Sequence, residues 1–130
     1  MIIRGTTPYH NFTLPLLAEE VQSIYATYFQ ENKKVLEKGT SDFEIINVED
    51  LYENASMGVE SDEANQSVAS VHLTQEDTLK FKYYFEPNTR RNFVFVQLTV
   101  VDSNGEVYRS IPLKQKLVPA FKDDVIEGGV

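Results

Sequence analysis

Two apolar-alternating segments that flank a short polar turn constrain the fold of this chain more than any other feature. They run from Asn92 to Leu117, around a turn at positions 102–106. In the first segment, the apolar residues from Val94 to Val100 recur at every second position. β-Branched and aromatic residues at this period favour a pleated strand. Asn104-Gly105 offers the two positive-φ positions that a tight hairpin turn prefers. The pattern therefore predicts an antiparallel hairpin in an all-β chain.

Shorter segments with the same period recur along the chain and are bounded by proline, glycine or polar residues. They predict strands at 6–14, 21–30, 34–38, 43–48, 67–73, 82–85 and 107–117. Residues 21–30 also fit a helical stripe, so a helix stays open there. Thr74 is placed to cap one short helical turn, with Leu79 and Phe81 entering the core. Seven to eight strands and one helical turn predict a two-sheet antiparallel sandwich.

The length and composition fit one ordinary globular domain. The chain has 130 residues, of which 42% are hydrophobic, and this is enough for one core but not for two. It has no cysteine, which excludes disulfides and thiolate metal sites. The opening residues lack the pattern of a signal peptide, and no apolar run reaches membrane-spanning length. We therefore expect a single domain over 1–130, cytoplasmic after synthesis, with no membrane insertion.

The acidic residues are unevenly distributed. The net charge is −8, and no Lys or Arg lies between Gly39 and Leu79, a stretch with ten of the twenty acids. A chain without a contiguous basic face is not expected to bind nucleic acid. Residues 49–66 interrupt the alternation and are interpreted as an acidic insertion loop. Such a loop is either a solvated surface or a contact for a partner, with Glu60, Asp62 and Glu63 as candidate contacts. Residues 119–130 are expected to form a flexible or docking tail.

No arrangement of residues predicts catalysis, a cofactor or a metal. His10 and His72 lie far apart and show no metal-ligand spacing. The segment at 102–106 superficially resembles a calcium loop, but a hairpin turn explains each of its residues. Adjacent carboxylates, such as Glu76 and Asp77, lie in polar runs and do not form a facing pair. We therefore expect a protein that is not an enzyme.

The aromatic residues offer the strongest candidate contacts. Tyr83, Tyr84 and Phe85 follow one another, so they occupy both faces of the strand expected at 82–85. At least one of these rings should then face outward. Exposed tyrosine makes a good interface anchor because it is large and loses little torsional freedom. The alternative that all three belong to the core stays open.

Several framework segments carry a family resemblance. They are the opening 1–8 and its continuation His10-Asn11-Phe12-Thr13-Leu14-Pro15, followed by 71–79 and 96–100. Together they resemble small tail-region proteins of phages and prophages of Gram-positive gut bacteria. Those proteins are similar to the immunoglobulin-like N-terminal domain of phage baseplate upper proteins. In this chain the Cys-Trp-Cys pattern of antibody domains is missing, and residues 49–66 look like an addition.

The resemblance implies a virion or prophage structural part of the tail or baseplate. Its expected partners are other phage structural proteins or further copies of itself, and its expected location is the host cytoplasm and then the virion. One alternative is a carbohydrate- or ligand-binding module, which a surface cleft with two or more aromatic rings would favour. Another is an acidic inhibitor or nucleic-acid mimic, which would bind a basic enzyme in a salt-dependent manner.

Overall fold

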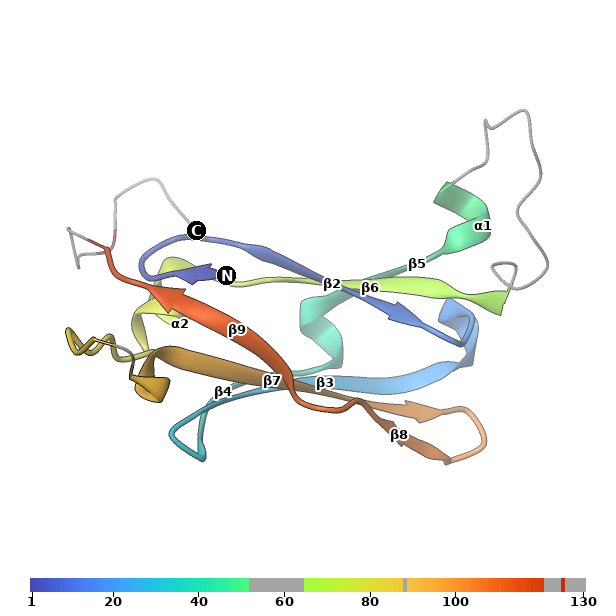
Figure 1. The fold of residues 1–130 in the computed structure, drawn as a ribbon. Helices are drawn as coiled ribbons and strands as arrows, with labels where there is room; N and C mark the ends of the chain where they lie inside the picture. Colours follow the sequence, from blue (N-terminus) through green and yellow to red (C-terminus); the bar gives the residue numbers. More distant parts are fainter. Residues whose placement is uncertain (52–64, 88, 121–124, 126–130) are drawn as a thin grey trace.

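The computed structural model describes residues 1–51, 65–87, 89–120 and 125, and it folds them into two β-sheets that lie one over the other (Figure 1). The larger sheet has the strand order β1-β9-β7-β3-β4, and β8 pairs with the last residues of β7. Its strands are β1 (Ile2–Ile3), β3 (Val21–Gln30), β4 (Lys33–Lys38), β7 (Phe93–Asp102), β8 (Val107–Arg109) and β9 (Leu113–Val118). The all-β, two-sheet prediction is confirmed.

The smaller sheet has the order β2-β6-β5. Its strands are β2 (Tyr9–Leu14), β5 (Phe43–Asn47) and β6 (Ser67–His72), and both pairs are antiparallel. Short helical segments connect the strands of the two sheets. They are η1 (Ala18–Glu20), η2 (Thr40–Asp42), α1 (Val48–Leu51), α2 (Gln75–Leu79) and η4 (Arg90–Asn92). Within the described residues, no helix is long and apolar enough to cross a membrane.

β3 and β7 form the centre of the larger sheet. They pair antiparallel, with Ile24 opposite Val100 and Tyr28 opposite Val96. The side chains of these four residues face the interior, because inward positions recur at every second residue of a strand. The helical alternative for residues 21–30 was therefore wrong, and the strand is confirmed.

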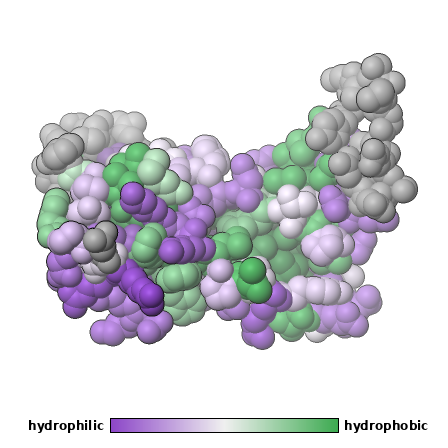
Figure 2. All heavy atoms as spheres, in the orientation of Figure 1, coloured by the Kyte–Doolittle hydropathy of each residue, from purple (hydrophilic) through white to green (hydrophobic). Residues whose placement is uncertain are grey.

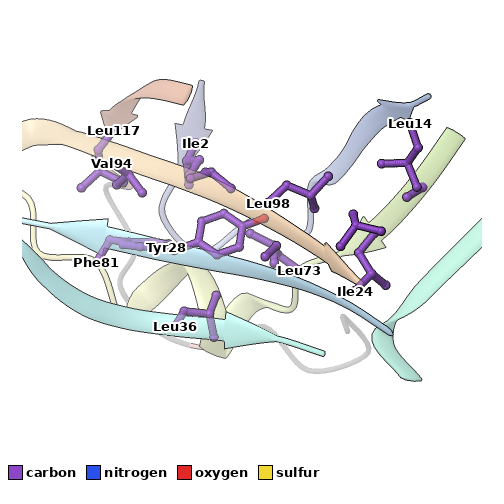
Figure 3. Close-up of a cluster of buried hydrophobic side chains, with 14 residues drawn as sticks. Ile2, Leu14, Ile24, Tyr28, Leu36, Leu73, Phe81, Val94, Leu98 and Leu117 are labelled. Carbon is purple, nitrogen blue, oxygen red and sulfur yellow. The ribbon is translucent and has the colours of Figure 1, made fainter. Parts of the chain in front are cut away.

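The core fills the space between the sheets. Tyr28 and Phe81 lie at its centre with no exposed surface, and their ring centroids are 6.0 Å apart (Figure 3). Leu73, Leu98 and Ile24 point into the same space (Figure 3). The buried cluster consists of Ile2, Leu14, Ile24, Ala26, Tyr28, Leu36, Ala69, Leu73, Phe81, Val94, Val96, Leu98, Val100 and Leu117.

The predicted helical turn after β6 is confirmed as α2. The Thr74 hydroxyl accepts from the N–H of Asp77, and the Asp77 carboxylate accepts from the N–H of Thr74, which together form a capping box. Lys38 on β4 contacts the same carboxylate at 2.6 Å. Burial alone raises the pKa of Asp77, but the hydrogen bonds from Lys38 and Thr74 outweigh it and lower the pKa. Phe81 is buried as expected, whereas Leu79 is only half-buried.

Three details of the strand prediction were wrong. The return segment at 107–117 is not one strand, because 110–112 separate β8 from β9 and Pro112 has no N–H to donate to a ladder. β1 was not predicted, and with it the described residues form nine strands. β1 runs parallel to β9, with Ile2 opposite Leu117, so the sandwich is not wholly antiparallel.

The turns also differ from the prediction. In the turn after β7, Gly105 has a positive φ of 83°, but Asn104 does not. Asp102 closes this turn, since its Oδ1 accepts from the N–H groups of Asn104 and Glu106 at 2.9 Å. The turn between β3 and β4 has two successive positive φ values, 53° at Glu31 and 62° at Asn32. This is the two-residue turn whose twist matches that of a hairpin.

Candidate functional site

The segment with Tyr83, Tyr84 and Phe85 is an extended loop and not a strand, so the prediction at 82–85 was wrong. Hydrogen bonds from side chains take the place of the backbone hydrogen bonds that a neighbouring strand would form. The buried Gln30 amide donates to the carbonyl of Lys82 at 2.6 Å and accepts from its N–H at 2.9 Å. Asn92 does the same for Tyr84, at 2.7 and 2.8 Å. Two amide side chains therefore fix the backbone of this loop.

The three aromatic residues have different environments. Tyr83 is half-buried against the core, and Phe85 meets its ring edge-on with centroids 4.8 Å apart. Phe85 itself is 85% exposed. Tyr84 is half-buried by the charged residues around it. The structure thus exposes one of the three rings to solvent, which fits the expectation that at least one faces outward.

Tyr84 belongs to a charged network that holds the loop against the β3–β4 turn. Its hydroxyl donates to Glu31 at 2.6 Å, and Arg91 contacts Glu31 at 2.9 Å and Glu86 at 3.3 Å. The Arg91 guanidinium also lies 4.4 Å from the centroid of the Tyr84 ring, a cation–π distance. The hydrogen bond from Tyr84 is the main cause of a lowered pKa at Glu31, and in turn it raises the pKa of Tyr84.

Next to this network, the outer face of the larger sheet forms an aromatic hollow. Phe29 on β3 lies opposite Phe95 on β7, and Phe95 lies opposite Lys114 on β9. One part of the hollow has a volume of about 620 Å³ and is lined by Glu31, Asn32, Arg90, Arg91, Phe93, Phe95 and Lys114. A second part of about 430 Å³ is lined by Phe29, Asn32, Phe95 and Pro112.

Cations cover part of the aromatic surface in and around this hollow. The Nζ of Lys114 lies 3.8 Å from the centroid of the Phe93 ring, and that of Lys82 lies 4.9 Å from the Tyr84 ring. Phe95 in the hollow is 39% exposed. Figure 2 shows hydrophobic side chains interleaved with hydrophilic ones on the face turned to the viewer. We call the aromatic hollow and Phe85 together the aromatic surface. Basic residues lie around it.

The sequence analysis did not single out Phe29, Phe93, Phe95 or Lys114. Phe93 and Phe95 alternate with inward-facing valines, so the outward position of their rings could be read from the period. Their meeting with Phe29 and Lys114 could not, because it depends on the register between three strands. The other predicted contacts, Glu60, Asp62 and Glu63, lie outside the described residues, as do most of the 49–66 segment and most of the 119–130 tail.

The two histidines, distant in sequence, lie one register position apart on the paired strands β2 and β6, but their side chains face opposite sides of the smaller sheet. His10 is partly buried, with its Nδ1 2.6 Å from the hydroxyl of Tyr28. His72 stacks on Tyr9 at 4.0 Å between ring centroids, on the outer face of the smaller sheet. Throughout the part of the chain that the structure describes, no three His, Asp or Glu residues gather in a way that could hold a metal ion. The side chain of Asp102 is engaged by its own turn and by the hydroxyl of Tyr108.

The arrangement offers exposed rings and charged side chains that can contact a binding partner. Its cations include Arg91, which pairs with Glu31 and Glu86, and Lys114, which lies over the Phe93 ring, and its apolar groups include rings exposed to solvent. Comparison of the chain with models of protein families, with curated proteins and with solved structures gives no match. The functional conclusion therefore depends on the geometry of the aromatic surface and on the resemblance of the framework segments.

Proposed function

We propose that this protein is a non-enzymatic adaptor of a phage or prophage tail or baseplate, with an immunoglobulin-like fold. It acts by docking its aromatic surface onto a neighbouring structural protein or onto another copy of itself. The observation that carries this proposal is the aromatic surface, where Phe85 and Phe95 remain exposed. Apolar surface that gathers in one place and is edged by polar residues is typical of protein contacts.

The strand order supports the immunoglobulin-like part of the proposal. In that fold, strands B, E and D form one sheet, and strands G, F, C and C′ form the other. The order β2-β6-β5 corresponds to the first sheet, and β9-β7-β3-β4 to the second. Tyr28 on β3 supplies the large buried ring that strand C of antibody domains supplies as tryptophan. With no cysteine in the chain, packing around Tyr28 and Phe81 replaces the usual disulfide.

The shape of the aromatic surface favours a macromolecular partner. Phe85 projects from a loop, whereas Phe95 lies in the hollow, so a partner must follow both a protrusion and a depression. Phe93 and Tyr84 already have cations against their rings, which leaves less bare ring for stacking on a small molecule. Large rings that become desolvated at the centre of a contact contribute most of the binding energy of typical interfaces. The phage setting is supported by the framework resemblance alone.

The proposal is tested in the bacterium that carries the gene. Particles are released by prophage induction and separated on a density gradient, and the chain is then detected by mass spectrometry. We expect the wild-type protein to band with tail-containing particles. The double variant Phe85→Ser, Phe95→Ser should be lost from them, while Tyr9→Ser, which removes an exposed ring from the other sheet, should be retained. Absence of the wild-type chain from all particles would overturn the proposal.

A second candidate function is carbohydrate or ligand binding, which was expected to show a cleft with two or more aromatic rings. The hollow meets that description, since Phe93 and Phe95 line one part and Phe29 and Phe95 the other. A titration of the labelled protein with cell-wall oligosaccharides, followed by NMR, separates the two functions. Saturable shifts confined to the hollow and lost in Phe95→Ser would favour the ligand function over docking.

A further inference from the structure

Seven basic side chains surround the aromatic surface, and all seven are exposed. We call this group the basic end; it consists of Lys33, Lys34, Lys82, Arg90, Arg91, Lys114 and Lys116. Arg91 pairs with Glu31 and Glu86, and Lys34 lies 3.9 Å from Glu37. Across the described residues, the other five make no ion pair. A protein with a net charge of −8 thus carries a local excess of positive charge beside exposed rings.

The opposite end of the sandwich has the opposite charge. We call this group the acidic end; it consists of Glu19, Glu20, Glu49 and Asp50. Asn47 ties η1 to β5, since its side chain accepts from the N–H of Ala18 and donates to Glu19. α1 follows β5 directly, so it brings Glu49 and Asp50 to the same end. In the parts of the chain that are described, none of the four makes an ion pair.

The acidic end also has exposed apolar side chains. Ile46 on β5 is 37% exposed, and Leu51 on α1 is 52% exposed. Figure 1 places α1 at one end of the molecule, with the β3–β4 turn and η4 at the other. Each end therefore combines unpaired charge of one sign with apolar surface. The two ends match each other in chemistry and are separated by the length of the sandwich.

Charge decides which ends can meet. Two basic ends or two acidic ends brought together would place like charges opposite one another, which disfavours a two-fold dimer through either end. A basic end against an acidic end pairs the charges and covers Phe95 and Phe85 with apolar side chains of the neighbour. Because the two ends lie on opposite sides of the molecule, such a contact leaves one end of each kind free. The contact is thus heterologous and repeats along a row of copies.

We propose that the aromatic surface takes the acidic end of a second copy of this chain, and that copies join head to tail. The inference rests on the proposed docking function and specifies its partner. It predicts that the number of copies in an assembly increases with protein concentration, and that the assemblies are rings or short rows. It also predicts that salt weakens the association, because the contact joins exposed charges.

The test uses sedimentation velocity on the full-length chain at about 50 mM and about 500 mM salt. Wild-type protein should associate with increasing concentration at low salt and lose most of this association at high salt. Two neutralised variants separate the ends. The basic-end variant carries Arg90→Ser, Lys114→Ser and Lys116→Ser, and the acidic-end variant carries Glu20→Gln, Glu49→Gln and Asp50→Asn. Each variant alone should remain monomeric.

Mixing the variants gives the decisive measurement. Each retains the end that the other has lost, so an equimolar mixture should form a one-to-one dimer that does not grow further. Arg109→Ser removes a cation outside the basic end and should associate like the wild type. Unchanged urea midpoints show that the variants are folded. A wild-type chain that stays monomeric at low salt would overturn the inference, as would an acidic-end variant that still associates by itself. Docking to another tail protein is decided separately by the particle experiment.

Discussion

The side chain of Gln30 acts as a strand partner for Lys82, accepting from its N–H and donating to its carbonyl. The same amide nitrogen also donates to the carbonyl of Arg91 at 2.8 Å. Gln30 is the last residue of β3 and is 5% exposed. A buried amide that satisfies three backbone groups fixes the loop at 82–86, here called the aromatic loop, to the sheet and, with it, the position of Phe85.

Replacement of Gln30 by leucine should therefore destabilise the protein. The change keeps the volume but leaves three backbone groups without their partner, for an expected loss of about 2 kcal/mol in the free energy of unfolding. Urea denaturation followed by circular dichroism measures this loss. The control is Gln22→Leu, an exposed glutamine in the same strand, which should change stability by less than about 0.5 kcal/mol. Equal losses in both variants would contradict the role of Gln30.

The β3–β4 turn gives a second prediction. Asn32 has a φ of 62°, a region that asparagine and glycine tolerate better than residues with an unbranched apolar side chain. Asn32→Ala should lower the free energy of unfolding by about 1 kcal/mol, whereas Asn32→Gly should not lower it. Gly105→Ala is the matched test in the other hairpin: its φ is 83°, and a Cβ there meets no atom within 4 Å. A loss at Gly105 would therefore come from the backbone alone. Urea midpoints of the three variants measure these changes, and an equal midpoint for Asn32→Ala and Asn32→Gly would contradict the role of the positive φ.

The strand framework was predictable because local pattern determines it. Residues 93–102 and 21–30 alternate at period two, and the fold places the inward set of each in one core. The cap at Thr74 was equally local, since its partner Asp77 is three residues away. β1 was missed because it has two residues, too few to show a period, and it depends on pairing with the distant β9.

The aromatic surface was only partly predictable. The strand prediction at 82–85 was wrong because aromatic residues favour strands, whereas the hydrogen-bond partners of this loop are side chains, and one of these lies 52 residues away. The hollow needs the register of β3, β7 and β9 before Phe29, Phe95 and Lys114 come together. The uneven distribution of acidic and basic residues was visible in the sequence. That these residues gather at two opposite ends of the sandwich could be known only from the strand order.

The buried pair of His10 and Tyr28 predicts loss of stability in acid. Burial, and secondarily the N-terminal ammonium, lower the pKa of His10 below its ordinary value of 6.5, while burial raises the pKa of Tyr28. The unfolded chain therefore binds a proton at His10 more readily than the folded chain does. Stability should be fully present above about pH 6.5 and fall as the pH decreases below it.

Melting temperatures between about pH 7.5 and pH 5 measure this dependence. In His10→Gln, the part of the decrease between pH 6.5 and pH 5 that comes from this residue should disappear. His72→Gln removes the other histidine and leaves the buried pair intact, so it provides the comparison. Identical pH profiles for wild type and His10→Gln would show that the buried imidazole does not contribute.

The aromatic loop gives the last prediction, which separates core from contact residues among Tyr83 and Phe85. Tyr83 packs against the buried cluster, so Tyr83→Ser should reduce the free energy of unfolding by about 2 kcal/mol through lost apolar burial. Phe85 is 85% exposed and keeps only its edge-on contact with Tyr83, so Phe85→Ser should reduce it by less than about 1 kcal/mol. If Phe85 serves docking, the same variant should nevertheless weaken association at low salt more than Tyr9→Ser does. Urea denaturation and sedimentation of the same samples give both quantities. A Phe85→Ser variant that loses stability but keeps association would mark the ring as part of the fold and not of the contact.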